Sequence, residues 1–168
     1  MKKYGLLFAV ILVLMLLVIP MSGIFGVRPA MLEAEARFSH SIEDTWLCAT
    51  SEPTDQMAAM LFYSPERDDF TYSIYVNRPG LSFGWFFRGG GSTVEVEANI
   101  AEYTVEGYTS RAYVSMNTQR IERVLFGNDT MLELDPDKPF ALVVPPELGS
   151  VQFCTEDGEW VQAVSHPL

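Results

Sequence analysis

The first part of the chain is almost uniformly apolar. Between Lys3 and Arg28 lie 24 residues without a single charged side chain. A helix of that length, at 1.5 Å per residue, spans roughly 36 Å, more than the roughly 30 Å hydrocarbon core of a bilayer. A helix in a water-soluble core would carry a polar stripe, and this stretch has none. The pattern predicts that residues 1–27 form one N-terminal transmembrane or signal helix.

The same segment could be retained as a membrane anchor or cleaved as a signal peptide. Lys2 and Lys3 give it the basic start of a signal peptide, and Pro20 is placed to end its helix. Signal peptidase needs small residues just before the cut, however, and residues 20–22 and 24–26 offer one each. We therefore favour a retained single-pass anchor, with secretion after cleavage as the alternative. In both cases the lysines stay inside and the C-terminal part lies outside the cell membrane.

A change of pattern follows the apolar run. Pro29 suits the first turn of a helix, and residues 30–37 are nearly all strong helix formers. We expect residues 28–44 to form a short helical stalk whose helix ends near residues 39–41.

From about Thr45 the pattern alternates between apolar and polar positions. Such alternation covers residues 70–76, 94–98, 112–116 and 140–144, and turn-forming residues separate these runs. Asp157-Gly158, between 151–155 and 160–164, is a strong hairpin signal. One buried and one wet face is typical of antiparallel sheets. Residues 45–168 are predicted to be an extracytoplasmic β domain, an antiparallel β-sandwich or open barrel of eight to nine strands.

Charge narrows the choice of partners. The chain holds 22 acidic and 11 basic residues, and two of the basic ones precede the apolar run, so the exported part carries 9 minus 22, or −13. Such a domain repels nucleic acid. The predicted partners are the membrane, through the N-terminal helix, and an unknown protein or carbohydrate.

Two cysteines lie near opposite ends of the β domain. In an oxidising compartment Cys48 and Cys154 could form a disulfide that closes a loop of about 100 residues and contributes roughly 4–5 kcal/mol. The alternative is two separate buried thiols that act as small apolar residues.

An aromatic row is the most distinctive local feature. Leu81, Phe83, Trp85 and Phe87 alternate on one face of an expected strand. Buried, they would form the centre of the core; exposed, they would offer a docking or carbohydrate-stacking surface. Phe83, Trp85 and Phe87 are therefore the candidate ligand-contact residues.

No catalytic, cofactor or metal site is predicted. His40 and His166 lie in the stalk and near the C-terminus, where a rigid catalytic dyad is not expected. Arg88-Gly89-Gly90-Gly91-Ser92 is interpreted as a hairpin loop, because a phosphate loop needs a helix after it. Asp135-Pro136-Asp137 is interpreted as a solvated turn. The abundant carboxylates leave one enzymatic alternative, a hydrolase with a pair of them.

The arrangement resembles small bacterial proteins with a basic N-terminus, one apolar segment and a short extracytoplasmic β domain. The residues concerned are Met1-Lys2-Lys3 with the apolar run, residues 81–88 and residues 151–158. The resemblance implies a Gram-positive-like source, in which a disulfide is less expected, and implies no activity. The sequence as a whole favours a membrane-anchored extracytoplasmic binding or accessory protein.

Overall fold

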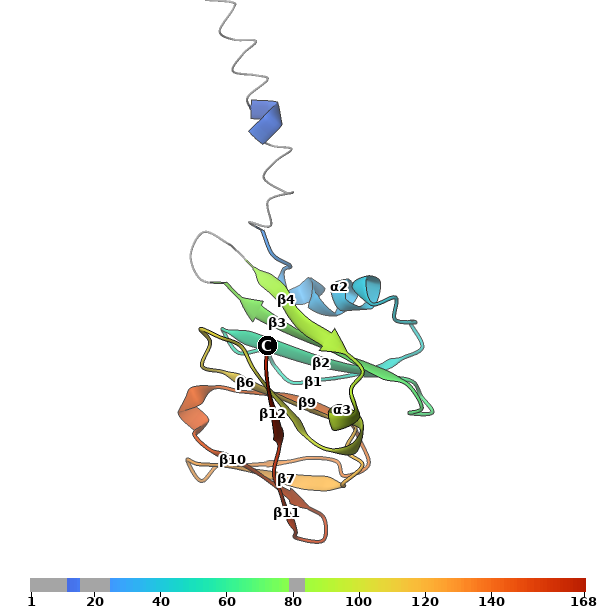
Figure 1. Ribbon diagram of the computed structural model, residues 1–168, viewed down its shortest axis with the longest axis vertical. Coiled ribbons are helices and arrows are strands. Elements are labelled where there is room, and N and C mark those ends of the chain that lie inside the picture. The colour runs from blue at the N-terminus through green and yellow to red at the C-terminus, as the bar shows by residue number, and fades with distance from the viewer. Residues whose placement is uncertain (1–11, 16–24, 79–83) are drawn as a thin grey trace, which may run out of the picture.

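Three four-stranded sheets make up most of the molecule (Figure 1). The structure is a computed structural model that describes residues 12–15, 25–78 and 84–168. The first sheet has the order β1 (Leu47–Thr50), β2 (Met57–Tyr63), β3 (Phe70–Asn77), β4 (Trp85–Gly91). The second has the order β12 (Val164–Pro167), β5 (Ala101–Thr104), β6 (Arg111–Ser115), β9 (Phe140–Val144). The third has the order β11 (Trp160–Val161), β10 (Val151–Thr155), β7 (Ile121–Phe126), β8 (Met131–Glu133).

In the described residues from 25 onward, four short helices accompany the sheets. They are η1 (Pro29–Met31), α2 (Leu32–Ser39), α3 (Val94–Ala98) and η2 (Pro146–Leu148). The prediction of a mainly β chain is confirmed. Twelve strands are present in the described residues, more than the eight to nine expected. One pair, β12 with β5, is parallel, so the second sheet is mixed rather than purely antiparallel.

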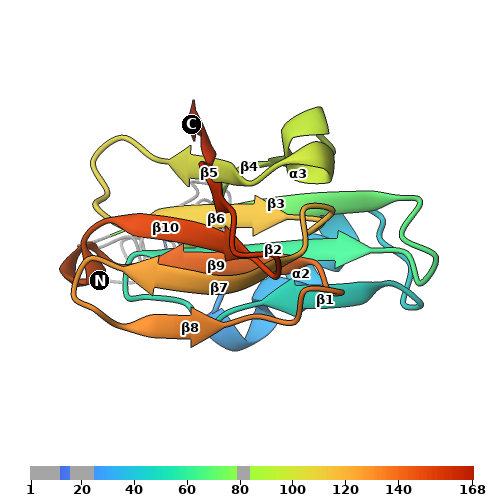
Figure 2. The same cartoon turned by 90° about the horizontal axis from the view of Figure 1, so that it is seen from below.

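The layers are held together by three apolar clusters, and their order is α2, first sheet, second sheet, third sheet (Figures 1 and 2). Between the first two sheets, Ile74 and Val76 of β3 meet Val114 of β6. Between the second and third sheets, Tyr113 packs with Phe153. The second sheet is therefore covered on both faces, which explains why nearly every residue of β6 is buried.

Several expected strands are confirmed to within a residue or two. The alternation over 70–76 corresponds to β3, that over 112–116 to β6, and that over 140–144 to β9. The hairpin at Asp157-Gly158 is also confirmed: β10 and β11 pair antiparallel, and Gly158 has a φ of 85°, which glycine adopts without steric cost.

The expected stalk contains a helix that belongs to the folded body. α2 ends at Ser39, within the predicted limits, and its Leu32 and Ala36 are buried against Ala58, Met60 and Phe62 on the outer face of the first sheet. A helix that buries one face against a sheet is fixed relative to it. The segment is a layer of the fold rather than a free spacer.

Two local predictions around the glycine run are wrong. Residues 89–91, expected in a hairpin loop, are part of β4, and a register shift lies opposite Ile74 and Tyr75. A Cβ at Gly90 would lie 2.5 Å from the carbonyl oxygen of Tyr72, so the strands approach more closely than a side chain allows.

The strand expected over 94–98 is the single-turn helix α3. Val96 is fully buried whereas Val94 is 70% exposed, so the two valines do not share a face as alternate strand residues would. The Met116 N–H donates to the carbonyl of Val96 at 2.8 Å, which ties this turn to the end of β6.

The chain joins the body at the edge of β4. The N–H and carbonyl of Val27 make hydrogen bonds of 2.8 and 2.9 Å with the backbone of Trp85. Most of the predicted N-terminal helix, residues 1–11 and 16–24, lies outside the described residues. Among the residues described, no helix is both long and apolar enough to cross a bilayer.

Candidate functional site

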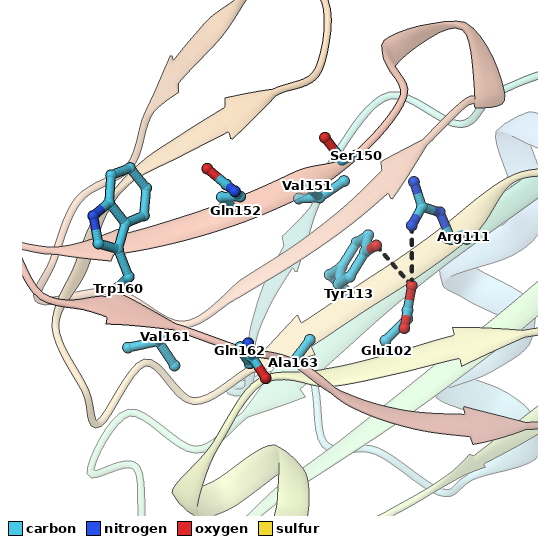
Figure 3. Close-up of a pocket in the computed structure, with 10 residues that line it drawn as sticks. All are labelled: Glu102, Arg111, Tyr113, Ser150, Val151, Gln152, Trp160, Val161, Gln162 and Ala163. Carbon is cyan, nitrogen blue, oxygen red and sulfur yellow. Dashed lines mark hydrogen bonds and ion pairs between the residues drawn. The ribbon is translucent and has the colours of Figure 1, made fainter.

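A cleft of about 390 Å³ opens between the second and third sheets. Its volume falls within the range of small-molecule sites. One wall comes from β5 and β6, and the other from β10, β11 and the residues after β11. The lining residues, drawn in Figure 3, are Glu102, Arg111, Tyr113, Ser150, Val151, Gln152, Trp160, Val161, Gln162 and Ala163.

Strand alternation explains why the polar side chains of the second sheet reach this cleft. Ala101 and Tyr103 of β5 are buried toward the first sheet, so Glu102 between them points to the other face. Glu102 is directly opposite Tyr113 in the β5–β6 register. Arg111, two residues before Tyr113, shares its face. The pairing of two strands therefore gathers a carboxylate, a phenol and a guanidinium at one point.

These three side chains form a connected network (Figure 3). The Tyr113 hydroxyl donates to Glu102 Oε1 at 2.8 Å, and Arg111 Nη1 lies 3.4 Å from the same oxygen. Arg111 also donates to the carbonyl of Gly149, at the start of the opposite wall. Each group has a partner, so the network is held in place before any ligand arrives.

Tyr113 acts in this network as a neutral donor. Burial raises the pKa of its hydroxyl well above the ordinary value of a phenol, and the hydrogen bond to Glu102 raises that pKa further. Its ring packs edge-on against Phe153 at 5.2 Å between centroids. The phenol therefore fixes the orientation of Glu102 and joins the cleft to the core.

The opposite end of the cleft carries an exposed aromatic ring. Trp160 is 59% exposed, one of the most exposed large apolar side chains in the described residues. It pairs with Cys154, two residues from Gln152, so the indole and this amide lie on the same face of the third sheet, opposite to Phe153, which packs against Tyr113 of the second sheet. Gln162 adds a second amide.

The lining of the cleft is polar and close to neutral. Glu102 and Arg111 offset each other's charge, and the other polar lining residues are uncharged. Glu102 is the only carboxylate in the lining. Ser150 has no histidine among the other lining residues to activate it. The arrangement offers hydrogen bonds and an aromatic surface rather than a nucleophile with its base.

The aromatic row predicted from the sequence is divided by the fold. Phe83 lies outside the described residues. Trp85 is buried beneath α2, and Phe87 is 44% exposed on β4, where its ring packs against His40 and Tyr75. Trp85 is thus a core residue, and Phe87 remains the one described member of the row with a largely open face.

The two cysteines are free and lie in different parts of the fold. Cys48 is on β1 of the first sheet and packs against the cluster beneath α2. Cys154 is buried on β10 of the third sheet. Of the two alternatives drawn from the sequence, the structure has the pair of separate thiols. Burial raises the pKa of Cys48 to about 12, and the nearby Glu33 carboxylate raises it as well.

The remaining candidates form no catalytic centre. His40 is the C-cap residue of α2, and His166 lies on β12 with its ring against Tyr103. Within the described parts of the chain, no group of three His, Cys, Asp or Glu residues is arranged to hold a metal ion. Asp135 and Asp137 lie in an exposed turn, paired with Lys138 and Arg120 respectively.

A second cleft, of about 370 Å³, contains the acidic side chains that the hydrolase alternative would use. Asp137 is ion-paired with Arg120 at 2.6 Å, and Asp68 accepts a hydrogen bond from the Ser64 hydroxyl at 2.6 Å. Two of the three carboxylates in this second cleft are thus bound to partners within the protein. Glu97 is the third.

Comparison of the chain with protein-family models, with curated proteins and with solved structures found no match. Fold and site define a mainly β protein of three sheets with a polar cleft that has Trp160 in its lining. Sequence reasoning missed the residues of this cleft. The eleven-residue separation of Glu102 and Tyr113 hides their pairing, and the exposure of Trp160 has no sequence signal.

Proposed function

We propose that this chain is a single-pass membrane-anchored, extracytoplasmic binding protein that recognises a carbohydrate in the cleft between the second and third sheets. The stacked sheets act in this proposal as the β-sandwich expected from the sequence. The anchor rests on the 24-residue uncharged stretch, and the ligand class rests on the cleft.

The exposed indole of Trp160 beside amide groups is the observation that carries the carbohydrate proposal. A sugar ring has an apolar face that packs on an aromatic ring and hydroxyls that need hydrogen-bond partners. The lining supplies both: Gln152 shares the face of the indole, and Gln162 and Glu102 add hydrogen-bond partners within the cleft. Because the Glu102–Arg111 pair leaves the lining close to neutral, a neutral oligosaccharide fits better than an anionic one.

The alternative, an extracytoplasmic hydrolase that uses paired carboxylates, receives less support. A retaining or inverting mechanism needs two free carboxyl groups facing one substrate. The first cleft has one carboxylate, and two of the three in the second cleft already have protein partners.

The test is a binding measurement on the full chain in nanodiscs, against a panel of neutral oligosaccharides. We expect Trp160→Ala to abolish binding of any oligosaccharide that the unmodified protein retains. Phe87→Ala is the matched control, because it removes an exposed aromatic ring from the row first singled out in the sequence, on another sheet. It should leave binding unchanged.

Two results would contradict the proposal. If Phe87→Ala abolishes binding and Trp160→Ala does not, the site is on β4. If the protein shortens the oligosaccharides instead of retaining them, the hydrolase alternative holds, and Glu97→Gln and Glu102→Gln then identify the cleft responsible.

A further inference from the structure

Helix α2 has two apolar faces, and only one of them is covered. Leu32 and Ala36, four residues apart, are buried against the first sheet. Met31 at the N-cap, Ala34 and Phe38 follow the same three- and four-residue spacing on the opposite side. Met31 is 53% exposed and Phe38 is 86% exposed. A surface helix normally carries polar residues on its outer face. The exposed apolar stripe formed by Met31, Ala34 and Phe38 therefore indicates that another surface covers it.

The charged side chains of α2 are engaged away from this stripe. Glu33 is ion-paired with Arg37 at 2.9 Å. Glu35 accepts hydrogen bonds from Ser39 Oγ at 2.6 Å and from the hydroxyl of Tyr75 on the first sheet. Each carboxylate of the helix therefore has a partner within the protein, and the outward stripe keeps its apolar character.

Arg37 likewise turns toward the body. It donates to the carbonyl of Trp46 at 3.1 Å, and its guanidinium lies 5.1 Å from the ring centroid of Phe62 beneath the helix. The only cation of α2 is thus held on the sheet side.

The position of α2 relative to Val27 is fixed. Val27, the last residue of the uncharged stretch, is hydrogen-bonded to Trp85 on both sides of its peptide unit. A Cβ at Gly26 would lie 2.5 Å from the Trp85 carbonyl oxygen, so this approach depends on glycine. Met31 is four residues further on, which limits its distance from Val27 to about 14 Å. Figure 1 shows α2 lying across the end of the body at which the chain enters.

We propose that α2 is an interfacial helix that lies on the bilayer surface and buries Met31 and Phe38 at the boundary between headgroups and acyl chains. The proposal rests on the membrane anchor of the proposed function and goes beyond it by orienting the domain. Helices with an apolar outer face beside a membrane segment bind in this way.

Cations at the same end of the fold fit this placement. Arg28 follows Val27 directly, and Arg78 follows Asn77, which pairs with Trp85. The Arg78 guanidinium lies 4.3 Å from the ring centroid of Phe86, and long basic side chains of this kind reach toward lipid phosphates. A second copy of the chain is a weaker candidate, because so narrow a stripe falls far short of the roughly 1,200 Å² that stable protein interfaces bury.

An oriented domain would present its cleft outward. The third sheet, which forms one wall of the cleft, lies at the opposite end of the layered body from α2 (Figure 1). With α2 on the lipid, the cleft faces away from the membrane, toward ligands outside the cell.

The test uses the full chain in lipid vesicles, with an environment-sensitive fluorophore attached at Ala34→Cys. We expect brominated phospholipids to quench this fluorophore and its emission to shift to shorter wavelength. The matched control is Val94→Cys on α3, an exposed apolar position on another helix, which should show neither effect. The unmodified chain, labelled in parallel, gives the background from Cys48 and Cys154. Adding Met31→Ser and Phe38→Ser to Ala34→Cys should remove the quenching, and thermal unfolding checks that this variant folds.

The outcomes separate this inference from the anchor itself. If the protein floats with the vesicles but the Ala34→Cys fluorophore is not quenched, the interfacial helix is wrong and the anchor stands. A blue shift without quenching means that a protein surface, such as a second copy, covers the stripe, and it also overturns the inference. Quenching that survives the serine substitutions shows that Met31 and Phe38 do not hold the helix there. Failure to float removes the anchor and the inference together.

Discussion

The buried tyrosines should make the stability of the fold depend on pH, because each hydroxyl titrates differently in the folded and unfolded states. The pKa of Tyr113 is raised by burial and by Glu102, and that of Tyr75 by burial and by Glu35. A phenol with a raised folded-state pKa stabilises the fold fully below its unfolded pKa of about 10, and this contribution is lost as the pH rises through the folded value.

We therefore expect the free energy of unfolding to fall with increasing pH above about pH 10. Denaturant titrations of the full chain in detergent at a series of alkaline pH values would measure this. Tyr113→Phe should make the decline shallower, because it removes one of the titrating groups. A decline of unchanged steepness in that variant would show that Tyr113 does not titrate as the structure indicates.

The thiols provide a second prediction at the residue scale. Since the pKa of Cys48 is about 12 and Cys154 is buried, both should react slowly with a thiol reagent in the native protein at neutral pH. Two thiols per chain should react after denaturation without reductant. A protein isolated without reductant that yields no thiol under those conditions would restore the disulfide hypothesis.

At the scale of elements, one buried side chain holds the turn between β6 and β7. Asn117 has a φ of 58°, a conformation that asparagine tolerates better than most residues. Its Oδ1 accepts from the Ile121 N–H at 2.7 Å, and its Nδ2 lies 3.2 Å from the carbonyl oxygens of Ile121, Asp135 and Pro136. The amide thus joins β6, β7 and the turn before β9.

Asn117→Ala should lower the free energy of unfolding by about 1–3 kcal/mol, because it leaves buried backbone groups without partners. Asn128→Ala is the matched control. Asn128 is exposed and accepts one hydrogen bond, from the Thr130 N–H at 3.0 Å, so its loss should cost much less. Denaturant titration of both variants measures the difference, and equal effects would contradict the role of Asn117.

Element identity was predictable wherever local pattern and burial agreed. β3, β6 and β9 alternate in sequence, and each was found. The failures lie where burial depends on distant neighbours. The alternation of Val94 and Val96 looked like a strand, but contact with the end of β6 buries only Val96 and closes a helical turn. The glycines of β4 resembled a loop, yet they extend a strand that closely approaches Tyr72.

The candidate site was hidden for a related reason. Glu102 and Arg111 are unremarkable charged residues in the sequence, and they meet because β5 and β6 pair in one register. Trp160 could be assigned to a hairpin but not to a surface. The cleft forms because two sheets stack in a particular way. The apolar and polar pattern within a single strand does not predict that stacking.

For the molecule as a whole, the proposed mode of membrane attachment rests on charge and on the length of the apolar stretch. Residues 28–168 have a net charge of −13, from nine basic and 22 acidic residues, so electrostatic attraction would not hold them to an anionic membrane. In the proposed anchor, the uncharged stretch therefore supplies the binding energy. We therefore expect the protein to remain in the membrane fraction after washing with high salt and with alkaline carbonate, both of which release peripherally bound proteins.

Deletion of residues 5–24 tests the same argument from the opposite side. This deletion retains Gly26 and Val27, and with them the hydrogen bonds to Trp85, so the first sheet keeps its edge contact. Without the apolar stretch, α2 offers only Met31 and Phe38 to lipid, and so small an apolar area gives at most weak, reversible membrane binding. The shortened chain should therefore appear in the soluble fraction after cell lysis, whereas the full chain should not. If the full chain is also recovered there, the apolar stretch does not reside in lipid, and both the anchor and the orientation inferred from α2 must be given up.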